Sequence, residues 1–260
     1  MNGFILGSFL AYSTITGAAS NSQRPEVFWA ERLVEEVAPQ NNLYASHPTI
    51  VQWIEDGTSP ARNRSVCSSL VTAIIERAYG LEETTIEQWF GTNAPYAVDY
   101  EHTIAAGRGF TLVRKASEIQ PGDVIAIAYA PGSHPTGHVM LADSVAHIRR
   151  ATQPIVAGLS QYELTVIDSS HSGHGTHDTR LIGQTYVTGV GRGTLRLYAR
   201  ADGTIAGYSW STRTVSRFYG SGEHAIVVGR YLGHPPSGAP VSTTQSDPGA
   251  DDAASQLEDP

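Results

Sequence analysis

Apolar residues recur at helical spacing in the first part of the chain. The clearest run covers residues 63–80, where apolar side chains return every three or four positions until Gly80 ends the pattern. A similar run follows Pro25, a residue type favoured in a first helical turn. Shorter helices are predicted at 47–57, 84–91 and 95–107, each bounded by Pro or Gly.

From Phe110 onward the pattern changes to that of strands. Short apolar or alternating segments are separated by Gly, Pro and Asp, and the run "RADGTI" predicts a hairpin. Strands are predicted within residues 109–116, 122–130, 137–145, 162–169, 193–211 and 223–232. Helices followed by a largely antiparallel sheet predict an α+β fold, without the βαβ alternation of nucleotide-binding sheets. "GVGRG", at 189–193, lacks phosphate-loop spacing and predicts a turn.

Composition limits the class of protein further. With 260 residues, 40% hydrophobic and 16% charged, the chain can bury a substantial core, and we place one domain at residues 21–233. The net charge is -8, and Lys115 is the chain's single lysine among dispersed arginines. A nucleic-acid partner is therefore excluded, because phosphate binding needs clustered positive charge.

The two ends of the chain differ from this domain. Residues 1–20 are apolar and end in small side chains, as a secretory signal does, although no basic residue precedes Arg24. Secretion or a cell-envelope location is favoured, and a cytoplasmic protein with a packed N-terminal segment is the alternative. The segment is too polar for a stable membrane span. Residues 234–260 hold five acids and no Lys or Arg, which predicts a disordered acidic tail. The oligomeric state is left open.

The chain's one cysteine, Cys67, falls in the first turn of the helix predicted at 63–80. A lone cysteine is commonly a small buried apolar residue. At a helix start, however, the positive end of the dipole and the unpaired amides favour the nucleophilic thiolate. The position therefore makes Cys67 a candidate nucleophile.

A nucleophilic cysteine needs a base, and the base needs an orienting group. His138 opens the apolar run "HVMLA", and Asp168 ends the strand "LTVID". If these strands are neighbours, His138 can face the helix start while Asp168 accepts a hydrogen bond from its ring. His224 also opens an apolar strand and is the rival base.

Together these motifs resemble the papain-like cysteine hydrolases of the NlpC type and their CHAP-type relatives. The resemblance rests on "CSSLV", "QPGDVIAI", "GHVMLA" and a polar residue on a later strand, and covers about residues 63–170. It implies a papain-like fold with Cys67 as nucleophile, His138 as base and Asp168 as orienting residue. It also implies a bacterial thiol peptidase or amidase that needs no cofactor and acts on a peptide or peptidoglycan-like substrate. Departures from the pattern are Val66 before the cysteine and Ser69 two positions after it.

The segment "DSSHSGHGTHD", which begins with Asp168 at the end of the strand "LTVID", has letters in common with subtilisin-type proteases. Asp168 and His174 are too close in sequence to lie on separate elements, and no serine nucleophile follows, so that interpretation fails. We predict instead a loop bordering the cleft, whose His171, His174 and His177 face solvent and contact substrate. Zinc binding by these histidines and Asp178 is the alternative, but the spacing matches no closed site, so no metal is expected.

Two other functions share this interpretation of the fold. An acyltransferase would use the same three residues but pass the acyl group to an alcohol or amine. A catalytically silent binding module would leave Cys67 unreactive.

Overall fold

The computed structural model describes residues 23–57 and 60–237. The N-terminal segment predicted at 1–20 and residues 238–260 of the predicted tail lie outside the described residues. Within those described, no helix is both long and apolar enough to cross a membrane.

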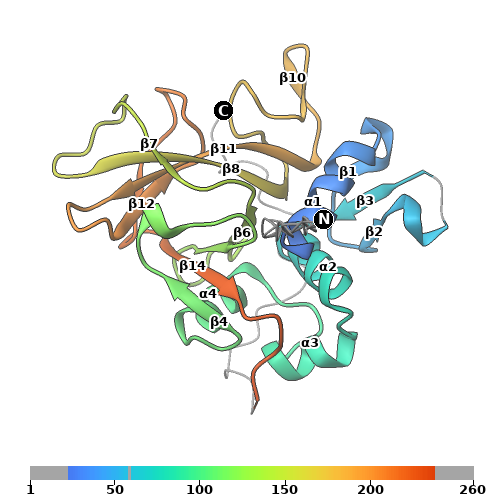
Figure 1. Ribbon diagram of the computed structural model, residues 1–260. Helices are drawn as coiled ribbons and strands as arrows, with labels where there is room; N and C mark the ends of the chain where they lie inside the picture. The colour runs from blue at the N-terminus through green and yellow to red at the C-terminus, as the bar shows by residue number, and fades with distance from the viewer. Residues whose placement is uncertain (1–22, 58–59, 238–260) are drawn as a thin grey trace, which may run out of the picture.

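The α-helices come first in the chain and gather in the lower and right-hand part of Figure 1. They are α1 (Pro25–Glu36), α2 (Cys67–Tyr79), α3 (Glu83–Phe90) and α4 (Ala97–Ala105). Helix α2 begins at Cys67 and ends before Gly80, whose left-handed φ of 63° closes the helix. The prediction that Cys67 lies in the first turn of a helix is confirmed.

A nine-stranded sheet forms the rest of the domain, with every neighbouring pair antiparallel. Its order is β13-β12-β11-β8-β6-β5-β14-β4, with β7 paired to β8. The strands are β4 (Phe110–Val113), β5 (Val124–Ala128), β6 (Gly137–Ala142), β7 (His147–Ile148), β8 (Ser160–Ser170), β11 (Gly189–Ala199), β12 (Ile205–Ser209), β13 (Tyr219–Gly220) and β14 (Ala225–Tyr231). The α+β class with a mostly antiparallel sheet is confirmed.

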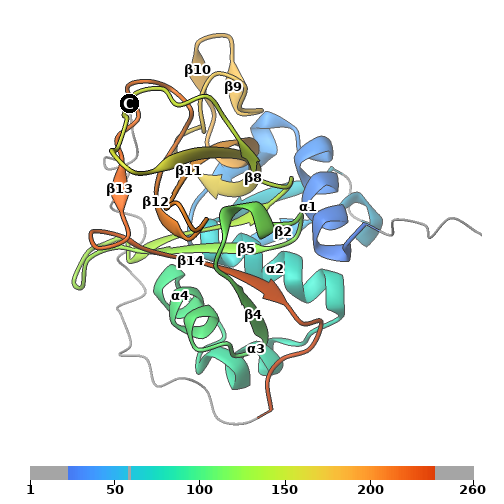
Figure 2. The same ribbon diagram turned by 60° about the vertical axis from the view of Figure 1, so that its left-hand side comes forward.

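The large sheet curls toward itself. The chain just after β4 pairs with the chain before β12, through a bridge between Lys115 and Thr204 and a hydrogen bond from Ile205 N to Arg114 O. Figure 2 shows β14, β12 and β8 wrapping around a common interior. The sheet therefore has an inner face that its own strands and loops largely enclose and an outer face that the helices cover.

Alternation along each strand divides the core between these two faces. In β5, Val124 and Ala126 pack with α1, α2, α3 and α4, whereas Ile125 and Ile127 pack in the interior of the curl. The same alternation puts His138 and Asp168 on the inner face of the sheet. His138 lies two residues before Met140 on β6, and Asp168 lies two residues after Val166 on β8, and both Met140 and Val166 pack in the interior of the curl.

A small second sheet precedes α2. It pairs β1 (Asn42–Tyr44), β3 (Arg62–Ser65) and β2 (Ile50–Gln52) in the order β1-β3-β2, next to the short 3-10 helices η1 (Pro39–Asn41) and η2 (Ile54–Asp56). The helix predicted at 47–57 is therefore wrong. Ile50 and Val51 are β-branched, and they gain ladder hydrogen bonds from β3 that a segment this short could not replace as a helix.

A further 3-10 helix, η3 (Ala116–Glu118), follows β4, and the hairpin of β9 (Leu181–Ile182) and β10 (Thr185–Tyr186) projects from the segment before β11. The "GVGRG" run lies inside β11, so the turn predicted at 189–193 is wrong.

Close contact between β5 and β6 depends on Gly137. A Cβ at this position would lie 1.9 Å from the carbonyl oxygen of Ile127 on β5. We therefore expect Gly137→Ala to lower the free energy of unfolding by about 1–3 kcal/mol or more, the effect of overpacking a rigid site. Urea denaturation of the purified variant measures it.

Gly222→Ala is the matched control, because a Cβ there meets nothing within 4 Å and should change stability by no more than about 0.5 kcal/mol. Equal denaturation midpoints for the two variants would show that β6 tolerates displacement.

Candidate active site

Cys67 is the first residue of α2 and is 5% exposed, with a free thiol. Strand β3 ends at Ser65, so Val66 alone separates the strand from the helix. The Ser169 hydroxyl, on β8, donates a hydrogen bond of 2.8 Å to the Ser65 carbonyl and so ties the entry of α2 to the large sheet. First-turn amides lack partners within their own helix, so the thiol lies beside backbone donors.

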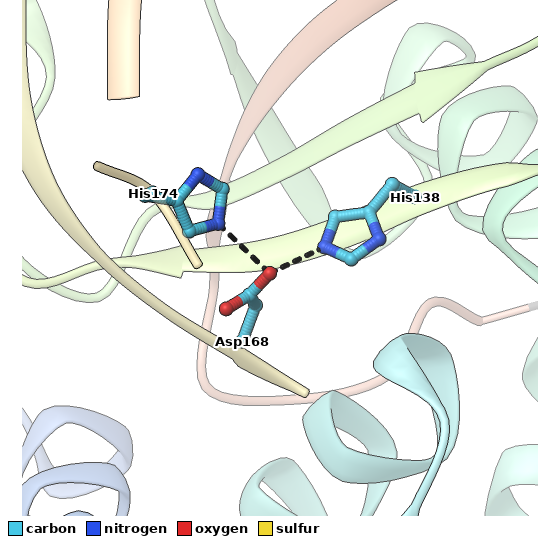
Figure 3. Close-up of side chains that lie close together, drawn as sticks. All are labelled: His138, Asp168 and His174. Carbon is cyan, nitrogen blue, oxygen red and sulfur yellow. Dashed lines mark hydrogen bonds and ion pairs between the residues drawn. The ribbon is translucent and has the colours of Figure 1, made fainter. Parts of the chain in front are cut away.

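His138 is the second residue of β6 and is buried. Its Nε2 donates a hydrogen bond of 2.7 Å to Asp168 Oδ2, and Cys67 lies near enough to the ring to influence its pKa. Nε2 faces Asp168 (Figure 3), so Nδ1 is the ring nitrogen left for another partner. Burial alone would lower the pKa of His138, but attraction to Cys67 and hydrogen bonds with Asp168 and Cys67 raise it well above its usual range.

Asp168 lies near the end of β8 with no exposed side-chain surface. Besides His138, its Oδ2 accepts a hydrogen bond of 2.9 Å from Nε2 of His174 (Figure 3). Its Oδ1 lies 2.9 Å from Arg180 Nη2, an ion pair outside hydrogen-bond geometry. Burial raises the pKa of Asp168, but Arg180, His174 and the hydrogen bonds outweigh burial and hold it well below its usual range.

Arg180 is itself paired by a second buried carboxylate, Asp178. Arg180 Nε lies 2.9 Å from Asp178 Oδ1 and Arg180 Nη2 lies 2.8 Å from Asp178 Oδ2, a two-point contact that fixes the guanidinium. Asp178 Oδ2 also accepts a hydrogen bond from the backbone N–H of His174 at 2.7 Å. These contacts fold the segment after β8 back over Asp168.

Glycines in β11 provide the space for this segment. A Cβ at Gly191 would lie 2.4 Å from Arg180 Nε, and a Cβ at Gly193 would lie 2.4 Å from Asp178 Oδ2 and 2.6 Å from His174 Cβ. The "GVGRG" run therefore accommodates the buried charged side chains.

The structure brings together Cys67, His138 and Asp168, the three residues predicted as catalytic. His224, the rival base, instead hydrogen-bonds Tyr208 at 2.8 Å and stacks on Tyr219 with ring centroids 4.5 Å apart.

The three histidines predicted to border the cleft have different environments. His171 is partly exposed and packs on Tyr44 with ring centroids 4.3 Å apart, and His177 is exposed. His174 is 1% exposed and hydrogen-bonds Asp168, so the prediction that its side chain faces solvent is wrong. The reason is that the buried Arg180–Asp178 pair draws the loop inward.

Sequence reasoning missed Arg180 and Trp210 as parts of the site. The Trp210 ring stacks on His174, with centroids 4.1 Å apart, and meets His138 edge to face at 4.7 Å. A buried arginine leaves no local sequence signal, although the nearby acidic Asp178 and the closely spaced glycines of β11 are features that could have suggested one.

His138, Asp168 and His174 also form the group best placed to hold a metal ion among the described residues, with ligand atoms within 4.8 Å of one another. An ion bound at about 2.1 Å in tetrahedral geometry would hold its ligand atoms about 3.4 Å apart. The nitrogen–oxygen distances here are 2.7 and 2.9 Å, which are hydrogen-bond lengths. Shared protons therefore fit the arrangement better than an ion.

A pocket of about 300 Å³ opens beside the first turns of α2. Val66 and Ser68, the neighbours of Cys67, line it, together with Tyr96 at the start of α4. Glu76 and Glu83 contribute carboxylates, and no Lys or Arg is among its lining residues. Burial and then the charges of Glu83 and Glu82 raise the pKa of Glu76.

The fold and site define an α+β protein with a buried cysteine, histidine and aspartate in contact. No family model and no solved structure matches the chain. The chain is 33% identical over 222 residues to uncharacterized protein R653 of Acanthamoeba polyphaga mimivirus, a match covering 79% of this chain and 95% of the relative. At that identity and coverage, the chain belongs to the same protein family as R653.

The name of this viral relative assigns no activity. The bacterial source, the absence of a cofactor and the peptide substrate expected from the resemblance therefore stay predictions, as does the secreted location expected from the N-terminal segment.

We expect Asp168→Asn to lower the free energy of unfolding at pH 7 by about 3–5 kcal/mol, because it removes one of the two buried carboxylates that pair with Arg180 and the charge that His138 and His174 share. The lowered pKa of Asp168 means that its carboxylate stabilises the fold above the ordinary aspartate pKa of about 3.8. That contribution is lost as the pH falls through the lower pKa of the folded state.

Urea midpoints of wild type and Asp168→Asn, measured from pH 7 to pH 3, should therefore differ by a constant amount at neutral pH and begin to approach each other only below about pH 3.8. Curves that differ by a constant amount over the whole range would contradict an ionised, stabilising Asp168.

Proposed function

We propose that the chain is a papain-like cysteine hydrolase of the NlpC type that cleaves an amide bond in a peptide. The observation that carries the proposal is the contact of Cys67, at a helix start, with His138, which in turn hydrogen-bonds Asp168. A nucleophile, a base and an orienting carboxylate in this order are the parts that nucleophilic catalysis needs. A helix start packed against an antiparallel sheet agrees with the papain-like arrangement.

In the proposed reaction, the Cys67 thiolate attacks the substrate carbonyl carbon and forms a tetrahedral oxyanion. First-turn amides of α2 are suited to stabilise that oxyanion, by a few kcal/mol per donor. The C–N bond then breaks as the His138 imidazolium gives its proton to the departing amine, which leaves an acyl-thioester on Cys67 and a neutral imidazole.

Water completes the cycle. His138 takes a proton from the water that attacks the thioester, and collapse of the second tetrahedral adduct releases a carboxylic acid and restores the thiolate and imidazolium. Through both halves, Asp168 holds the His138 ring with Nδ1 toward the sulfur.

The pocket beside α2 supports a preference among peptides. Its carboxylates, Glu76 and Glu83, and its lack of Lys or Arg favour a substrate segment bearing an amine or hydroxyl groups over an anionic one. A peptidoglycan-like peptide with a free amine meets this requirement, and secretion would bring the enzyme to such a substrate.

Alkylation of Cys67 tests the proposed ion pair without a known substrate, because the chain has one cysteine and each modified molecule reports on it. A free thiol loses about tenfold in iodoacetamide reactivity per pH unit below about 8.5. The raised pKa of His138 keeps its imidazolium at neutral pH, and in the proposed ion pair that positive charge favours the Cys67 thiolate. We therefore expect the wild-type rate to stay on a plateau down to about pH 6.

His138→Gln is the matched variant, and its alkylation rate should fall with pH as that of a free thiol does. A wild-type profile that also follows the free thiol would overturn the proposal and favour a silent binding module.

Turnover of peptide amides, followed by mass spectrometry, should be lost in Cys67→Ala and lowered by about 10²–10⁴ in His138→Gln, which lacks the base. Asp168→Asn should lose less than His138→Gln when rates are corrected for folded protein, because an orienting group is partly replaceable. The reverse order would assign the base elsewhere.

Product that forms only with an added alcohol or amine would identify an acyltransferase.

A further inference from the structure

Asp168 is bound by a second histidine that the proposed reaction does not use. His174 and Asp168 each have 0% side-chain exposure, and the two histidines, His138 and His174, donate to the same carboxylate oxygen. The environment of His174 determines how many protons its ring carries.

Both ring nitrogens of His174 face acceptors. Nε2 lies 2.9 Å from Asp168 Oδ2, and Nδ1 lies 2.7 Å from the backbone carbonyl oxygen of Trp210. A backbone carbonyl can only accept a hydrogen bond, and so can an ionised carboxylate. A neutral imidazole has one N–H, so either tautomer would leave two acceptor lone pairs facing each other inside the protein. Only the doubly protonated ring satisfies both contacts.

The charges around His174 balance when its ring is an imidazolium. Asp168, on β8, and Asp178 are negative, whereas Arg180 and His174 are positive, so these four groups sum to zero. On the neighbouring elements, β6 contributes His138 and α2 contributes Cys67, which form a separate ion pair in the proposed function. Trp210, against the face of the His174 ring, is uncharged.

We propose that His174 is a doubly protonated positioning residue, whose imidazolium holds Asp168 as a carboxylate aimed at His138 and limits the attraction of that carboxylate for the His138 proton. The second part of this role rests on the proposed function. Two imidazolium rings then share one carboxylate oxygen. Their like charges repel each other, because the ring nitrogens that face this oxygen lie within 4.8 Å of one another. His138 is thereby kept able to give its proton to the leaving amine.

The protonation of His174 is measurable directly by nitrogen-15 NMR of histidine-labelled wild-type protein. We expect both His174 ring nitrogens to carry a proton at pH 7, with the nitrogen shifts of an imidazolium. A neutral His174 tautomer at pH 7, or a signal that changes when zinc is added in stoichiometric amount, would overturn the proposal.

The effect on His138 is tested by His174→Gln, with His147→Gln, an exposed residue on β7, as the control. Loss of the neighbouring positive charge should move the upper inflection of the Cys67 alkylation profile, where His138 gives up its proton, to higher pH. The control should leave the inflection unchanged. An unchanged or lower inflection in His174→Gln would overturn the charge effect, since mere loosening of Asp168 would weaken its hold on the His138 proton.

The two measurements separate this inference from the proposed function. A thiolate plateau in wild type together with a neutral His174 would leave the hydrolase proposal standing and remove the role of His174. If His174→Gln does not fold, the nitrogen-15 spectrum of the wild type decides the inference alone.

Discussion

The buried carboxylate of Asp168 is the group on which the rest of the site depends. A carboxylate without exposed surface is destabilising unless cations and hydrogen-bond donors surround it. Here His138, His174 and Arg180 supply them, from β6 and from the segment after β8. Because that one charge holds three side chains, the position of the base, the path of the loop and the burial of the arginine are decided together.

The sheet is built to contain this charged group. Gly191 and Gly193 leave the face of β11 bare where Arg180, Asp178 and His174 lie against it. The register of β8 with β11 places Asp168 opposite Gly191, so the carboxylate and the space for its partners occur at the same level of the sheet. Strand β8 also carries Ser169, whose bond to Ser65 holds the start of α2 beside the carboxylate strand.

The helical layer and the curled sheet each contribute different groups to the site. The nucleophile comes from the helical layer, where a helix start offers backbone donors, and the base and carboxylate come from the sheet, whose paired strands hold them rigidly. The pocket lies on the helical side, along α2, so the proposed substrate would approach from the layer that carries the nucleophile and not from the packed interior of the curl.

The sequence by itself determined the features that depend on local periodicity. Helical spacing put Cys67 in a first turn, and strand alternation put His138 and Asp168 where neighbouring strands could bring them together, because a period of 3.6 or 2 residues is a property of adjacent positions. Only the tertiary structure decided the rest. Ile50 and Val51 became a strand because β3 lay beside them, and His174 turned inward because Arg180 and Asp178 required burial against the glycines of β11. These outcomes depend on contacts between segments distant in the chain, whose energies exceed the local preferences that a sequence pattern can record.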